Sequence, residues 1–112
     1  MKNRKCFIVI STNMKSWKRR AHNMEERVES DRFNLIHGRF HDEHFVAVSP
    51  RTVINGKEKP LKRWFKLRRA ILSCSTVYAL KEWEHDKECR KLVRFARITF
   101  RHVIGESWEE QI

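Results

Sequence analysis

The sequence predicts a single α/β domain with a mostly parallel sheet, and two patterns support that prediction. Short apolar runs rich in β-branched residues, typical of buried strands, alternate along the chain with segments whose apolar residues recur at helical spacing. The chain has 112 residues, 40% of them hydrophobic, which suits one modest core and is too short for two. Strands that alternate with helices indicate parallel strands joined by crossover helices.

The first elements are a buried strand and an amphipathic helix. Residues 5–11 form a continuous apolar run rich in β-branched side chains, as in a strand covered on both faces. Ser16 offers N-cap chemistry, and apolar residues then recur at spacings of four, three and four from Trp17 to Val28. This spacing predicts a helix of about 14 residues with one apolar stripe.

The middle of the chain predicts two further strands. Ser30 and Asp31 break the first helix, and residues 33–37 and 44–49 are both apolar and strand-like. About six residues separate the two runs, so a hairpin is the easier connection, although parallel neighbours remain open. Residues 51–60 contain an Asn-Gly turn signal and are expected to form a mobile basic loop.

The last part of the chain completes the alternation. A helix over residues 61–72 starts after a proline, and a short buried strand follows at residues 77–80. A long amphipathic helix is expected from residue 82 to about residue 98, and a final strand over residues 100–104.

These elements together favour a small Rossmann-like sandwich, with a mostly parallel sheet of four to five strands and three helices. Residues 1–105 form the single domain. Residues 106–112 form an acidic tail that is expected to fray.

The composition is strongly basic. Lysine and arginine number 25 against 14 acidic residues, a formal net charge of +11. Such a charge predicts an anionic partner, either a nucleic acid or an acidic protein surface, without choosing between them. No apolar run approaches the roughly 20 residues that span a bilayer, so we expect no membrane association. Three cysteines without framework spacing fit reduced thiols, and we expect a cytoplasmic protein, in the host cytoplasm if it is viral.

The bases fall into three groups that could contact phosphates or carboxylates. Trp17 and Trp64 are interleaved with them, as stacking platforms would be, but both also fall at core spacing. The candidate contact residues are Lys18, Arg19 and Arg20 in the first group, Lys62, Arg63, Lys66 and Arg69 in the second, and Arg90, Arg94, Arg97 and Arg101 in the third.

Candidate sites for metal or phosphate chemistry are weak. His37, His41 and His44 crowd one segment beside two acidic residues, a composition that can bind zinc, yet histidines placed in strands are the more ordinary explanation. The chain has only three glycines, all isolated, so a glycine-rich phosphate loop is absent from the sequence. We expect neither a metal nor another cofactor.

A resemblance to a known family rests on residues 67–105. Cys74 follows a helix and opens the apolar strand, Trp83 comes next, and a basic helix leads to the last apolar run. This order resembles the C-terminal half of the nucleoside deoxyribosyltransferase-like superfamily, especially its small uncharacterised bacterial and phage members. The resemblance implies an α/β fold with a catalytic glutamate in the last helix.

The departures from that pattern imply a scaffold that has lost its chemistry. Ser75 stands where the family carries an acidic residue, and Leu92 stands where it carries the glutamate that attacks the sugar. The family's Ser-x-Gly-Ala run becomes the four residues from Asp86 to Cys89. Glu88, one turn before Leu92, is the residue that could substitute for the nucleophile, with Asp86 beside it.

Two functions follow as expectations. The first is a non-enzymatic basic binding protein, a phage-type accessory factor that binds an acidic host protein or a nucleic acid and modulates or inhibits it. The alternative is a nucleotide N-glycosidase or deoxyribosyltransferase that acts on a deoxynucleoside monophosphate through Glu88 and Asp86. The oligomeric state is left open, including a homodimer.

Overall fold

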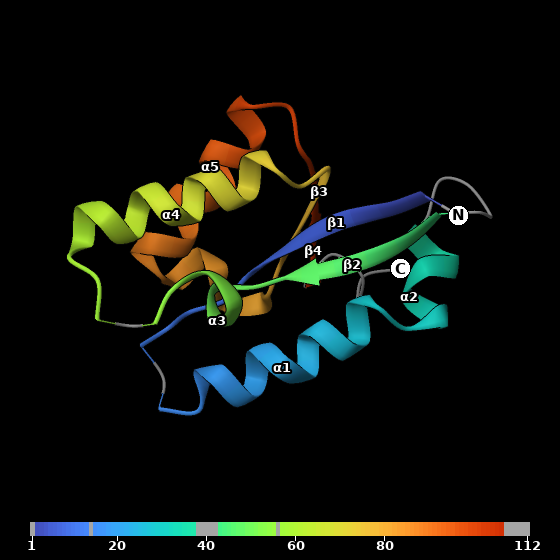
Figure 1. The fold of residues 1–112 in the computed structure, drawn as a ribbon, viewed down its shortest axis with the longest axis horizontal. Coiled ribbons are helices and arrows are strands. Elements are labelled where there is room, and N and C mark those ends of the chain that lie inside the picture. The colour runs from blue at the N-terminus through green and yellow to red at the C-terminus, as the bar shows by residue number, and fades with distance from the viewer. Residues whose placement is uncertain (1, 14, 38–42, 56, 107–112) are drawn as a thin grey trace.

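A four-stranded parallel sheet lies at the centre of the computed structural model, which describes residues 2–13, 15–37, 43–55 and 57–106 (Figure 1). The prediction of an α/β sandwich is therefore confirmed. The strands occur in the spatial order β2-β1-β3-β4, and every neighbouring pair is parallel. They are β1 (Lys2–Val9), β2 (Glu43–Val48), β3 (Thr76–Ala79) and β4 (His102–Gly105).

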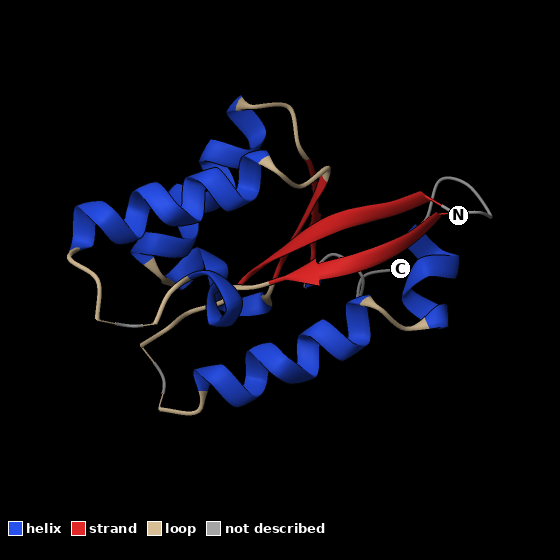
Figure 2. Ribbon diagram, in the orientation of Figure 1, coloured by secondary structure: helices blue, strands red, loops and turns tan. Residues whose placement is uncertain are grey.

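Helices cover both faces of this sheet (Figure 2). One face is covered by α1 (Trp17–Val28) and α2 (Asp31–His37), and the other by α4 (Pro60–Leu72) and α5 (Lys87–Ile98). Two short elements complete the fold: α3 (Pro50–Val53), and the 3-10 helix η1 (Lys81–His85) that connects β3 to α5.

The two central strands are buried on both faces, which divides the core into two halves. Side chains alternate across a strand, so Cys6 and Ile8 pack towards α1 and α2, whereas Phe7 and Val9 pack towards α4 and α5. β3 lies next to β1 and is also fully buried. The chain leaves β1 for β2 on one side and returns to β3 on the other, so the strand order reverses between β1 and β3.

The strand expected at residues 33–37 is wrong, because this segment is the helix α2. Ser30 does not simply break the preceding helix. The Oγ of Ser30 accepts a hydrogen bond from the backbone N–H of Phe33 at 3.2 Å, and Ser30 so caps the start of α2. Only Phe33 of α2 is buried, with its ring edge against Phe45 and Tyr78. The hairpin expected between residues 33–37 and 44–49 is also wrong, because the first of these segments is helical. The strand β2 pairs with β1 in parallel.

The long helix expected over residues 82–98 is interrupted. Residues 81–85 form η1, and Asp86 adopts an extended backbone before α5 begins at Lys87. The Asp86 carboxylate accepts a hydrogen bond from the backbone N–H of Cys89 at 2.9 Å, and this cap sets the start of α5. Part of the predicted basic loop is likewise helical, because Pro50 starts α3 with Ser49 as its cap.

The predicted acidic tail is anchored at its first residue. Glu106 is buried, and its carboxylate accepts hydrogen bonds from Arg27 at 3.4 Å and from the backbone N–H of Lys81 at 3.2 Å. Glu106 is therefore not part of a frayed end. Residues 107–112 lie outside the described residues.

Phe100 has an unusual backbone conformation just after α5. Its φ is 61°, in the left-handed region that glycine normally occupies after a helix, and it is the one described non-glycine residue with a positive φ. The aromatic side chain is 93% exposed, so it gains almost no burial in return. The conformation costs about 1 kcal/mol relative to glycine.

We expect Phe100→Gly to stabilise the fold by about 1 kcal/mol, because glycine adopts this conformation without a clash. Thermal unfolding followed by circular dichroism should show a Tm increase of about 5 °C. An unchanged or lower Tm would mean that the Phe100 side chain contributes to the fold.

Candidate functional site

The positive charge of the molecule is concentrated on the α4 and α5 side of the sheet. Helix α4 contains no acidic residue and α5 contains only Glu88. The two helices lie side by side (Figure 1). The rings of Trp64 and Phe95 pack edge to face between them, with 6.4 Å between the ring centroids. We call the outer surface of these two helices, with the bases that they carry, the α4–α5 surface. These bases are Lys62, Arg63, Lys66, Arg68 and Arg69 of α4 and Lys87, Arg90, Lys91, Arg94 and Arg97 of α5.

Only two of these bases are neutralised by ion pairs within the described chain. Arg63 forms a two-pronged pair with Glu88 at 2.8 and 2.9 Å, and also donates to Thr12 Oγ1. Lys66 lies 3.4 Å from the Glu58 carboxylate. Arg97 aside, the remaining bases of both helices form no ion pair with a described carboxylate.

The third group of predicted contact bases is partly tied to the fold. Arg90 donates to the Glu84 carbonyl at 3.1 Å, and the guanidinium of Arg97 lies over the Trp83 ring at 5.6 Å. Arg101 donates to the carbonyls of Leu72 and Thr99, and so holds the last turns of α4 and α5 together. Arg94 makes no described contact of this kind and is exposed.

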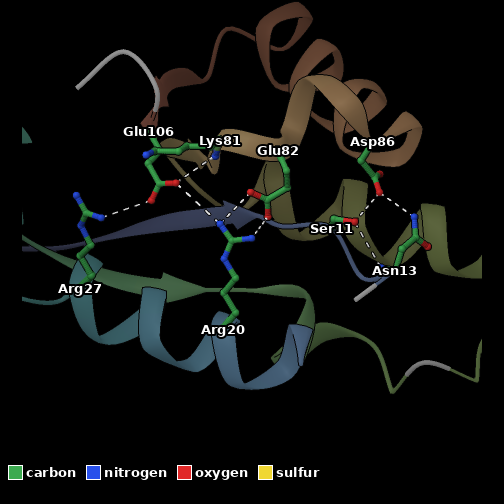
Figure 3. Close-up of polar contacts among 8 residues, drawn as sticks. All are labelled: Ser11, Asn13, Arg20, Arg27, Lys81, Glu82, Asp86 and Glu106. Atoms are coloured by element: carbon green, nitrogen blue, oxygen red, sulfur yellow. Dashed lines mark hydrogen bonds and ion pairs between the residues drawn. The ribbon is translucent and has the colours of Figure 1, made fainter. Parts of the chain in front are cut away.

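The first group of bases lies on the opposite side of the sheet, where Arg20, Arg27 and Arg51 form ion pairs (those of Arg20 and Arg27 are drawn in Figure 3). Arg20 donates to Glu82 at 2.9 Å, and Arg27 pairs with Glu106. Arg51 of α3 pairs with Glu25 of α1 at 2.7 Å. Lys18 lies over the Trp17 ring and Arg19 is exposed. The three groups therefore do not form one surface, and only the second and third come together.

Neither tryptophan predicted as a stacking platform is a free ring. Trp17 is half-buried and packs against both halves of the core. Trp64 packs against the core and Phe95, and the guanidinium of Arg68 lies 5.7 Å above its ring. Trp64 nevertheless lines a cavity, so part of its edge faces solvent.

Exposed apolar side chains on this same surface were not predicted. Leu61, Phe65 and Leu72 occur at spacings of four and seven on α4, and they face away from the core stripe of Leu67 and Ile71. The sequence holds the signal, because α4 carries two apolar stripes where a helix packed on one sheet needs only one. Ile98 and Phe100 are also exposed, at the end of α5.

A cavity of about 760 Å³ opens where the carboxyl ends of the two central strands meet the first turns of α4 and α5. Open α/β sheets bind their ligands at this point of strand-order reversal. The walls combine aromatic, basic and acidic side chains. They are Thr12, Asn13, Glu58, Pro60, Arg63, Trp64, Asp86, Lys87, Glu88 and Lys91.

Asp86 is a hydrogen-bonded carboxylate in the wall of this cavity (Figure 3). Its carboxylate accepts hydrogen bonds from Ser11 Oγ at 2.7 Å and Asn13 Nδ2 at 3.0 Å, besides the Cys89 N–H. Burial alone raises the pKa of Asp86, but the hydrogen bonds from Ser11 and Cys89 outweigh it and hold the pKa below its ordinary value. Asp86 is thus an ionised cap that joins β1 to α5.

The groups that could attack a sugar are engaged or buried. Both carboxylate oxygens of Glu88 accept from Arg63, and Leu92 lies in the core. All three cysteines are free and buried. Burial raises the pKa of the Cys6 thiol, and burial together with the nearby Asp86 charge raises that of Cys89, so both remain protonated.

The predicted histidine cluster is only partly described. His37 ends α2 with its ring 4.6 Å from the Phe33 ring, His44 lies in β2, and His41 lies outside the described residues. Among the residues that the structure describes, no three His, Cys, Asp or Glu side chains gather as metal ligands. None of the described helices is long and apolar enough to cross a membrane.

Comparison of the chain with protein-family models, curated proteins and solved structures finds no match. The function is therefore inferred from this chain's own charges, cavity and exposed side chains.

We expect Asp86→Ala to destabilise the fold by about 1–2 kcal/mol at pH 7, because α5 loses its cap and Ser11 its acceptor. The pKa of Asp86 is lower in the folded protein than in the unfolded chain, so as the pH falls the carboxylate becomes protonated in the unfolded chain first. The difference in free energy of unfolding between Asp86→Ala and the wild type should therefore shrink as the pH drops below 3.8, the ordinary pKa of this carboxyl group. Urea denaturation at pH 7, 5 and 3 measures it, with Asp31→Ala on α2 as the control. A difference that does not change with pH would contradict this role.

Proposed function

We propose that this protein is a non-enzymatic binding protein that recognises an anionic macromolecule through the α4–α5 surface. The observation that carries the proposal is the unequal division of charge between the two helical layers. Three carboxylates, Glu25, Glu82 and Glu106, pair with bases on the α1 side, whereas among the described residues bases such as Lys62, Arg69 and Arg94 on the α4–α5 side have no carboxylate partner.

An uncompensated basic surface carries a cost to an isolated protein. Like charges on adjacent helices repel one another, and evolution can remove them with acids at no cost to the core. Bases such as Arg69 and Arg94 point to solvent and have no described role in the fold. An anionic partner accounts for these bases, because complementary charges favour the complex and speed its association.

The scaffold is best explained as a degenerate relative of the deoxyribosyltransferase-like proteins that it resembles. Loss of the nucleophile to Leu92, now a core residue, supports a binding role in place of catalysis. We place the protein in the cytoplasm because its three thiols are free and buried. As a phage-type accessory factor in a host cell, it would modulate or inhibit the partner by covering it.

Reversing two charges of the α4–α5 surface should weaken binding to a polyanion by roughly tenfold or more, about 1.4 kcal/mol. The variant is Arg69→Glu with Arg94→Glu, and the matched control is Lys15→Glu with Arg32→Glu on the opposite side. All four positions are exposed, and both variants lower the net charge from +11 to +7.

Fluorescence anisotropy with labelled poly-glutamate and a labelled oligonucleotide measures the affinities at several salt concentrations. Equal weakening in both variants would show that only net charge matters and would overturn the assignment of the surface. Capture from lysate with and without nuclease then shows which class of polyanion is bound in the cell.

The cavity is the one observation that favours the second candidate, a nucleotide N-glycosidase or deoxyribosyltransferase using Glu88 and Asp86. Against it, Arg63 holds both oxygens of Glu88, and Asp86 serves as a cap. We expect no release of free base from deoxynucleoside monophosphates when the products are separated by chromatography. Release by the wild type that is lost in Glu88→Gln would establish the enzyme instead.

A further inference from the structure

Five exposed apolar side chains lie on or beside the helices that carry the unpaired bases. Their exposed fractions are 81% for Leu61, 63% for Phe65, 48% for Leu72, 64% for Ile98 and 93% for Phe100. In the rest of the described chain only Leu35 and Ile36 of α2 are comparable. Clustered apolar exposure of this kind marks interaction sites, whereas scattered single residues do not.

We call these five exposed side chains the apolar stripe: Leu61, Phe65 and Leu72 lie along α4, and Ile98 and Phe100 lie at the end of α5. Leu61, Phe65 and Leu72 run along α4 over a length of roughly 16 Å, about three helical turns. Arg101 donates to the carbonyls of both Leu72 and Thr99, at 3.0 and 3.1 Å, so the last turns of α4 and α5 meet there. Phe100 lies between Thr99 and Arg101 in the chain, at this junction with Leu72, the last residue of α4.

Phe100 is the strongest single indication that the stripe has a partner. Its left-handed backbone disfavours every residue with a Cβ, and its ring is almost fully exposed, so the isolated fold gains nothing from this side chain. Backbone strain that packing does not offset is concentrated at functional sites.

We propose that the α4–α5 surface binds an acidic amphipathic helix of a partner protein. This inference rests on the binding function proposed above and names its partner class. The apolar face of the partner helix would pack on the stripe, and its carboxylates would face Lys62, Arg69 and Arg94, which lie beside the stripe or on the adjacent helix. A helix laid into an apolar surface with flanking charges is a common form of peptide recognition.

Other occupants fit these residues less well. A nucleic acid would use the bases and stack on the two phenylalanines, but it offers nothing to the aliphatic side chains of Leu61, Leu72 and Ile98. A second copy of the chain would bring the same unpaired bases face to face, and like charges across an interface oppose association.

Three labelled probes of similar net charge test the partner class with the full-length protein. The first is a 15-residue acidic peptide with leucines at positions 1, 5, 8 and 12, chosen by design so that they share one helical face. The second has the same composition with the leucines dispersed around the helix, and the third is a single-stranded oligonucleotide. We expect the amphipathic peptide to bind at least about tenfold more tightly than the other two.

Two leucines give a matched pair of variants. Leu61 and Leu35 are 81% and 80% exposed, on opposite sides of the molecule. Leu61→Ser should weaken binding of the amphipathic peptide several-fold, and Leu35→Ser should leave it unchanged. Phe100→Gly should weaken the same binding while raising Tm, so loss of folding cannot explain its effect.

The outcomes separate this inference from the function on which it rests. Tighter binding of the oligonucleotide, unchanged by Phe100→Gly, would overturn the amphipathic-helix partner but leave an anionic partner in place. Equal affinity for both peptides would overturn the role of the apolar stripe. Binding of none of the three probes would overturn both proposals.

Discussion

The burial of β1 and β3 on both faces is the constraint on which the rest of this structure depends. Cys6, Phe7, Ile8 and Val9 are buried on both sides of the second half of β1, so helices must cover both faces of the sheet there. Each helix gives its apolar stripe to the core, and its charge is then left on the outer surface. The fold thereby creates two separate helical surfaces on which charge can be arranged independently.

The two surfaces are arranged differently. On the α1 side, carboxylates from distant parts of the chain reach the bases: Glu82 and Glu106 lie 62 and 79 residues from their partners Arg20 and Arg27. On the α4–α5 side, the ion pairs between described residues are those of Glu88 with Arg63 and of Glu58 with Lys66. The same side carries the exposed apolar stripe and the strained Phe100. Charge, apolar exposure and strain point to one surface.

Local pattern predicted much of the fold, and long-range contacts account for most of the errors. The strand β1 and the helices α1 and α4 followed from apolar spacing, because burial on a sheet imposes that spacing. The helix α2 was missed because it buries only Phe33 and depends on a cap from Ser30. The anchoring of Glu106 depends on Arg27 and Lys81, which no local pattern reveals. For the same reason the sequence placed Lys18, Arg19 and Arg20 with the other bases, although they lie on the other surface.

The central claim is that the α4–α5 surface is the binding surface, and an NMR titration tests it most directly. Uniformly 15N-labelled protein would be titrated with the unlabelled amphipathic acidic peptide, and amide shift changes mapped onto the chain. We expect shift changes along α4 and in the last turns of α5 through Phe100, with α1 and α2 nearly unaffected. Changes concentrated on α1 and α2, or spread evenly over both helical layers, would contradict it.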